Sequence, residues 1–212
     1  MNNILDIKPG IIIGDNYKTE LILPAWKGFQ SRQGNYGSRD SVEQSNGFVK
    51  VFIDGKAIDH VRITTIEQVN AIQYLVEHAE QVRDALLKGL QNELPKLKES
   101  YDELVPDIDT LEEFKNYIGL AIVHVMPSDK DGFAYIGFEL GCEWDIEHGA
   151  GVMMHKDRVI AIGQADTAFD SWITYADNGT IDDETEKWDK ENAGVLAQWQ
   201  KKENKKSWWK FW

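Results

Sequence analysis

Residues 117–126 read YIGLAIVHVM, and residues 133–144 read FAYIGFELGCEW. The first stretch is an almost continuous apolar run, which is typical of a central strand of a sheet. The second stretch alternates between apolar and other residues, as a strand with one face on a core does. Its predicted core face consists of Ile136, Phe138, Leu140, Cys142 and Trp144, with Glu139 and Glu143 on the opposite face. The two stretches therefore predict neighbouring strands, joined by the turn residues of 127–132.

The chain that follows supplies two shorter strands. Residues 152–155 and 159–163 are apolar and are separated by the turn-like Lys156-Asp157-Arg158. Together with the first two strands they predict an antiparallel meander of four. Upstream, residues 20–26 predict one more strand, and residues 48–53 and 57–63 predict an N-terminal hairpin around Asp54-Gly55.

One long central helix is expected to cover this sheet. Apolar residues recur three or four apart through residues 65–94, Thr64 or Thr65 can cap the start, and Pro95 is expected to interrupt the pattern. The fold class is therefore α+β: an antiparallel sheet, built from the hairpin and the meander, packed on the helix. We expect residues 1–180 to form this single domain and residues 181–212 to form a charged helix, at 182–202, with a Trp-rich tail.

Composition narrows the class of protein. The 212 residues are 42% hydrophobic and 28% charged, which is typical of a folded globular chain. The net charge is 13 negative, from 23 basic and 36 acidic residues, and this argues against nucleic acid as a partner. The lone Cys142 needs no oxidising compartment, and no apolar run is long enough for a membrane span. A cytoplasmic protein without integral membrane association is therefore predicted.

The charge is divided unevenly along the chain. Residues 201–212 hold five lysines and one glutamate, a net charge of 4 positive, so the rest of the chain carries 17 negative charges. The acidic body predicts a basic protein partner, such as a cognate toxin. The tail ends in the aromatic residues Trp208, Trp209, Phe211 and Trp212. Aromatic side chains dominate binding hot spots, so these four are expected to dock on the body or on a partner.

Ionisable residues concentrate in residues 142–152, CEWDIEHGAGV. In one interpretation His148 is a general base that Glu147 or Asp145 orients, as in a small-molecule, hydrolase-like enzyme. In the other, the acid and imidazole groups cap a turn and the glycines shape a bulge. We favour the structural interpretation, because the sequence places no nucleophile beside them. No residue is therefore assigned a catalytic role, and a non-enzymatic protein is favoured.

A metal site is not predicted at the same segment. Its candidate ligands would be Cys142, Asp145, Glu147, His148 and His155. Their spacing matches no known zinc motif, and Cys142 belongs to the apolar face of its strand. The common nucleotide-binding loops are missing as well, so no cofactor is expected.

The polar stretch 27–47 is either a cover for a site or a surface excursion. If it lies over the 142–152 segment, Arg32 and Tyr36 would meet Glu147 and His148 in a polar pocket, with Arg32 holding an anionic group. The predicted binding residues are Arg32, Tyr36, Trp26, Trp144, Glu147 and His148.

The segment W-D-x-E-H-G-x-G-V, residues 144–152, resembles the hairpin of an uncharacterised bacterial domain-of-unknown-function family. Three further segments are similar to that family in the same order, and the resemblance extends over about residues 20–168. They are residues 21–37, residues 71–75 (AIQYL) and residues 159–163 (VIAIG). Relatives of the family look like immunity proteins of bacterial toxin systems. The resemblance implies a binding module that inhibits a toxin and supplies no catalytic assignment.

Overall fold

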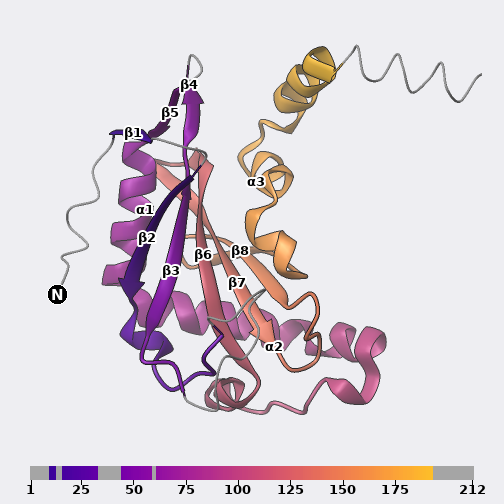
Figure 1. The fold of residues 1–212 in the computed structure, drawn as a ribbon. Coiled ribbons are helices and arrows are strands. Elements are labelled where there is room, and N and C mark those ends of the chain that lie inside the picture. The colour runs from indigo at the N-terminus through magenta and orange to yellow at the C-terminus, as the bar shows by residue number, and fades with distance from the viewer. Residues whose placement is uncertain (1–9, 13–15, 33–43, 59–60, 193–212) are drawn as a thin grey trace, which may run out of the picture. The chain divides into compact units, whose positions relative to one another are not determined.

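The structure is a computed structural model, and it describes residues 10–12, 16–32, 44–58 and 61–192. The chain divides into two compact units, Met1–Thr174 and Tyr175–Trp212, which we describe separately. The first unit is an α+β fold with a mixed six-stranded sheet (Figure 1). In spatial order its strands are β2 (Asn16–Ile22), β3 (Phe48–Asp54), β6 (Ile118–Lys130), β7 (Phe133–Cys142), β8 (Ala150–His155) and β9 (Arg158–Gly163).

The predicted four-strand meander is confirmed. Strands β6, β7, β8 and β9 are antiparallel neighbours, with Ile136 opposite Val125 on one side and opposite Met154 on the other. The predicted core face of β7 is confirmed, because Ile136, Phe138, Leu140, Cys142 and Trp144 all belong to the main core cluster. The opposite face is largely buried as well, so burial does not alternate along the strand.

The predicted N-terminal hairpin around Asp54-Gly55 is wrong. Strand β3 is antiparallel to β2 and parallel to β6, so both of its edges are already occupied. The parallel pair makes the sheet mixed rather than antiparallel. After Asp54 the chain enters a separate three-stranded sheet of β1 (Gly10–Ile12), β5 (Val61–Thr64) and β4 (Lys56–Ile58). The predicted strand at 20–26 also ends early, because Pro24 begins a 3₁₀ helix that reaches Trp26.

Two helices replace the single long one. α1 (Ile66–Glu77) begins at the predicted cap, Thr65, whose side chain forms a capping box with Gln68. It ends at His78, whose backbone leaves the helical region and whose ring stacks on Tyr74. α2 (Ala79–Tyr101) then runs in another direction (Figure 1). Pro95 lies inside α2 rather than ending it. A proline inside a helix costs one backbone hydrogen bond. Burial of the neighbouring Leu94 in the core offsets this cost, while Pro95 itself is exposed.

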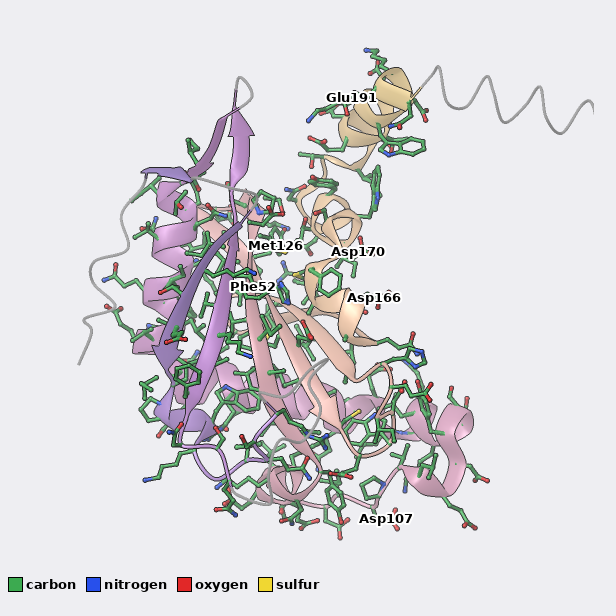
Figure 2. All side chains as sticks on the ribbon, in the orientation of Figure 1. Phe52, Asp107, Met126, Asp166, Asp170 and Glu191 are labelled. Carbon is green, nitrogen blue, oxygen red and sulfur yellow. The ribbon has the colours of Figure 1, made fainter. Side chains whose placement is uncertain are left out.

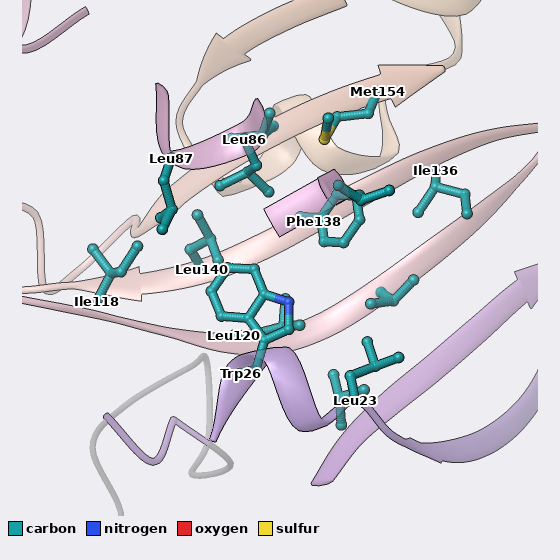
Figure 3. Close-up of a cluster of buried hydrophobic side chains, with 14 of the residues drawn as sticks. Leu23, Trp26, Leu86, Leu87, Ile118, Leu120, Ile136, Phe138, Leu140 and Met154 are labelled. Atoms are coloured by element: carbon teal, nitrogen blue, oxygen red, sulfur yellow. The ribbon is translucent and has the colours of Figure 1, made fainter. Parts of the chain in front are cut away.

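The main core lies between these helices and one face of the sheet. Figure 3 shows Leu86 and Leu87 of α2 facing Phe138 and Leu140 of β7, and all four are at most 1% exposed. Beyond α2, short 3₁₀ helices at Asp102–Leu104 and Leu111–Asn116 lead into β6. None of the helices in the described part of the chain is both long and apolar enough to cross a membrane.

The opposite face of the sheet is partly covered by the chain that follows β9. This chain forms a 3₁₀ helix, Ala165–Phe169, and then begins α3, Ser171–Asn178. Asp170 directly precedes α3, and its side chain accepts a hydrogen bond from the backbone N–H of Trp172 in the first turn of the helix. A small cluster of Met126, Tyr135 and Met153 lies on this face. Figure 2 shows Met126 and Phe52 on the side of the sheet that bears Asp166 and Asp170.

The second unit contains the rest of α3 and a further helix. This helix begins at Ile181 and continues to Asn192, where the described residues end. It agrees with the predicted charged helix at 182–202 as far as it is described. The remainder of that prediction, together with the aromatic tail residues Trp208 to Trp212, lies outside the described residues.

Candidate functional site

The connection between β7 and β8 carries a nearly buried carboxylate, Asp145, which is 8% exposed. Its Oδ2 accepts hydrogen bonds from the hydroxyl of Tyr101, at 2.7 Å, and from the amide of Gln164, at 3.3 Å. Tyr101 is the last residue of α2 and Gln164 follows β9. Asp145 thus ties a helix end and a strand end to the hairpin.

The other oxygen of Asp145 holds the hairpin turn. Oδ1 accepts the backbone N–H of His148, at 2.9 Å, and lies 3.1 Å from its Nδ1. The backbone oxygen of Asp145 accepts the N–H of Gly149, which has a positive φ of 65°. The acid therefore caps the turn, as in the structural interpretation, and it also orients the imidazole, as in the catalytic one. The two interpretations share one geometry.

These contacts set the ionisation of the site. Burial by itself would raise the pKa of Asp145, but the hydrogen bonds from the His148 backbone, Tyr101, the His148 ring and Gln164 lower it overall. The same contact raises the pKa of Tyr101, because its hydroxyl donates to a carboxylate, and burial adds to this effect. Asp145 is therefore a carboxylate at neutral pH.

Cys142 is next to this network but is not a candidate nucleophile. Its thiol is fully buried and donates to the backbone oxygen of Asp145, at 3.5 Å. Burial raises the pKa of Cys142 to about 12, so the reactive thiolate is absent at neutral pH. The prediction of a core cysteine is confirmed.

A second polar network lies at the end of β7 and is built around Arg32, which is 4% exposed. Its guanidinium binds Oε1 of Glu143 at 2.8 Å and the side-chain oxygen of Gln30 at 2.9 Å through Nε. The amide of Gln30 donates to the same Glu143 oxygen, at 2.8 Å, and to the backbone oxygen of Asn116, at 2.6 Å. The network fastens residues 30–32 to the sheet.

The predicted binding residues are only partly brought together. Arg32 forms its ion pair with Glu143, and Glu147 is exposed on the hairpin beside His148. Trp26 and Trp144 were predicted to bind a ligand, but both are buried and pack within the main core cluster. Tyr36 lies outside the described residues. In the described part of the chain no three His, Cys, Asp or Glu side chains are grouped so that they could hold a metal ion.

Sequence reasoning missed Gln30, Tyr101, Glu143 and Gln164 as parts of the site. Glu143 had a usable signal, because it is an acidic residue on the polar face of an alternating strand. For Tyr101 and Gln164 no local pattern points to Asp145, since 44 and 19 residues separate them from it.

The chain beside this site is strongly acidic. Residues 99–113 read ESYDELVPDIDTLEE and contain seven acidic residues and no basic one. All but Glu113 of these acids are exposed. Within the segment, Tyr101 contacts Asp145, so the acidic segment adjoins the β7–β8 connection. We call residues 99–113 together with the 143–148 connection the acidic end.

Another acid and histidine pair lies on the partly covered face of the sheet. His124 of β6 contacts Glu139 of β7 at 2.8 Å, and both side chains are mostly buried. The ring of His124 also contacts the rings of Phe52 and Phe169, whose centroids are 5.7 and 5.1 Å away. His124 is therefore a hydrogen-bonded histidine within the sheet.

Residues 29–169 match the family model of a domain of unknown function, DUF6985. The chain belongs to the DUF6985 family. The matched region contains both networks of the site and the acidic end. No curated protein and no solved structure matched the chain.

Proposed function

We propose that this protein is a bacterial, cytoplasmic binding protein of the immunity type, which inhibits a basic toxin by covering its active surface. The observation that carries the proposal is the acidic end, whose segment 99–113 has seven acids, six of them exposed, and no basic residue. The tight contacts of Asp145 and Arg32 support it, because they hold the neighbouring backbone in one conformation. A preorganised surface loses less entropy when it binds.

Charge explains why such a surface suits a basic partner. An excess of 13 negative charges attracts a basic protein over a distance and raises the rate of association. Complementary potentials also disfavour acidic partners. Catalysis is not required for this function.

The proposal predicts that neutralising the acidic end weakens binding to the basic product of a neighbouring gene. The variant is Glu99→Gln, Glu103→Gln and Asp109→Asn, three exposed acids of the segment. We expect the association rate to fall about tenfold at low salt, because steering depends on local charge. The measurement is surface plasmon resonance with the purified partner, together with the partner's toxicity in the presence of each variant.

The matched control neutralises three exposed acids elsewhere: Glu80→Gln, Asp131→Asn and Asp166→Asn. Both triple variants carry a net charge of 10 negative, 13 minus 3, so they differ only in where the charge is lost. Equal association rates for the two variants would show that the acidic end is not the interface. A partner that the wild-type protein neither binds nor inhibits would contradict the immunity function itself.

A second candidate function is a hydrolase-like enzyme, which the Asp145–His148 geometry favours. Asp145 Oδ1 lies 3.1 Å from Nδ1 of His148, and the histidine side chain is 59% exposed. An imidazole held by a carboxylate at Nδ1 presents its other nitrogen to a substrate, as a general base requires.

This candidate predicts that His148→Ala lowers any hydrolytic activity about a hundredfold, the loss typical of a missing general base. Asp145→Asn is expected to lower it too, and Glu147→Gln, in the same connection, is expected to leave it unchanged. The assay is a panel of chromogenic carboxylic and phosphoric esters, with circular dichroism to show that each variant is folded. Activity that survives in His148→Ala would exclude this role.

A further inference from the structure

Strand β2 forms one edge of the six-stranded sheet. It pairs with β3 on one side, and no described strand lies on the other. Its seven residues make it long enough to accept another strand, and such an edge is a ready template for pairing. The opposite edge strand, β9, has a single charged residue, Arg158, at its start.

The hydrogen bonding of β2 determines which residues face the free edge. The N–H of Leu23 donates to the backbone oxygen of Gly47, the residue before β3. Residue pairs of an antiparallel ladder alternate between bonded and non-bonded. Leu21 and Thr19 therefore bond toward β3. The backbone groups of Lys18, Glu20 and Ile22 point away from the sheet, toward the free edge.

Those positions also carry a distinctive charge pattern. Lys18 and Glu20 are exposed, and both lie on the face opposite the buried Leu21. Lys18 is held over the ring of Phe52, with Nζ 5.0 Å from its centroid. One basic and one acidic residue thus flank Thr19 symmetrically.

We propose that the free edge of β2 binds β2 of a second copy of this chain, in an antiparallel pair centred on Thr19. In this register Lys18 of each copy lies opposite Glu20 of the other, and Thr19 lies opposite Thr19. The outward backbone groups of both charged residues then bond across the interface. The result is a continuous sheet through a two-fold dimer.

Charge selects this register over its neighbours. Outward backbone groups meet only when the two-fold axis passes through a residue of β2. A pair centred on Lys18 places two lysines opposite each other, and a pair centred on Glu20 places two glutamates opposite each other. Like charges directly opposite destabilise a strand pair, whereas opposite charges stabilise it. Centring on Thr19 forms two favourable pairs at once.

The test uses the full-length chain and two charge reversals, Lys18→Glu and Glu20→Lys. Each reversal places like charges opposite each other twice in the dimer, so each is expected to raise the dissociation constant roughly thirtyfold. An equimolar mixture of the two variants is expected to form a mixed dimer as tight as the wild type, because every pair is again of opposite charge. Sedimentation velocity over a concentration series measures the dimers, and native mass spectrometry, with a tag on one variant, identifies the mixed species.

The measurements are made at about physiological ionic strength, where a screening length of about 8 Å limits repulsion between the acidic bodies. The two substitutions change only residues whose backbone groups do not bond toward β3. The fold is therefore expected to persist, and circular dichroism checks this. A wild-type chain that stays monomeric throughout the series would overturn the proposal. So would a dimer that neither reversal weakens, or two variants that fail to associate with each other.

Discussion

Gly137→Ala is expected to destabilise the protein by about 3 kcal/mol, at the upper end of the usual cost of overpacking. Gly137 lies within β7, where the 3₁₀ helix Ala165–Phe169 packs directly on the sheet. A Cβ at this position would be 1.6 Å from the backbone oxygen of Ala168 and 2.4 Å from its carbonyl carbon. Because these are backbone atoms, no side-chain rotation relieves the clash, and the whole short helix must move.

Urea unfolding monitored by circular dichroism measures the change in free energy. Gly132→Ala is the matched control, because no atom lies within 4 Å of its Cβ, but its φ of 79° strains any side chain. That strain is expected to cost only about 1 kcal/mol. If Gly137→Ala cost no more than Gly132→Ala, the helix would not be packed as tightly as the structure has it.

This close approach also shows what the sequence could and could not predict. Alternation within β7 and the short turns of the meander are local patterns, so the order of β6 to β9 was predictable. The covering of the other face by the 3₁₀ helix was not predictable, because no sequence pattern shows that Gly137 lies against the backbone of Ala168, 31 residues further along the chain. The parallel pairing of β3 with β6 joins residues such as Lys50 and Ile122, and no local pattern encodes such a pairing.

The site follows the same division. Asp145 and His148 were named from the sequence because they are neighbours in a short charged segment. Arg32 was named too, in a pocket with Glu147 and His148. The structure pairs it with Glu143, 111 residues away along the chain. The break between α1 and α2 at His78 was missed because the apolar spacing of three and four continues through it.

Asp145→Asn is expected to lower the free energy of unfolding by about 2 kcal/mol at neutral pH. Both carboxylate oxygens of Asp145 contact groups that donate or can donate a hydrogen bond. In asparagine one of these oxygens becomes an NH₂ group, which would face a donor and lose its hydrogen bonds whichever way the amide is turned. Because the pKa of Asp145 is lower in the folded protein than its ordinary value of 3.8, the carboxylate stabilises the fold above that pH. This stabilisation is lost as the pH falls through the folded pKa.

The difference in stability between the wild type and Asp145→Asn should therefore be constant near neutrality and shrink below pH 3.8. Urea unfolding at a series of pH values measures it. Glu147→Gln, an exposed acid in the same connection, is the control and should change stability little at any pH. Tyr101→Phe removes one donor to the carboxylate and is expected to cost about 1 kcal/mol. A difference between wild type and Asp145→Asn that persists unchanged into acid would mean that the charge of Asp145 does not stabilise the fold, and that the hairpin is held by its backbone contacts alone.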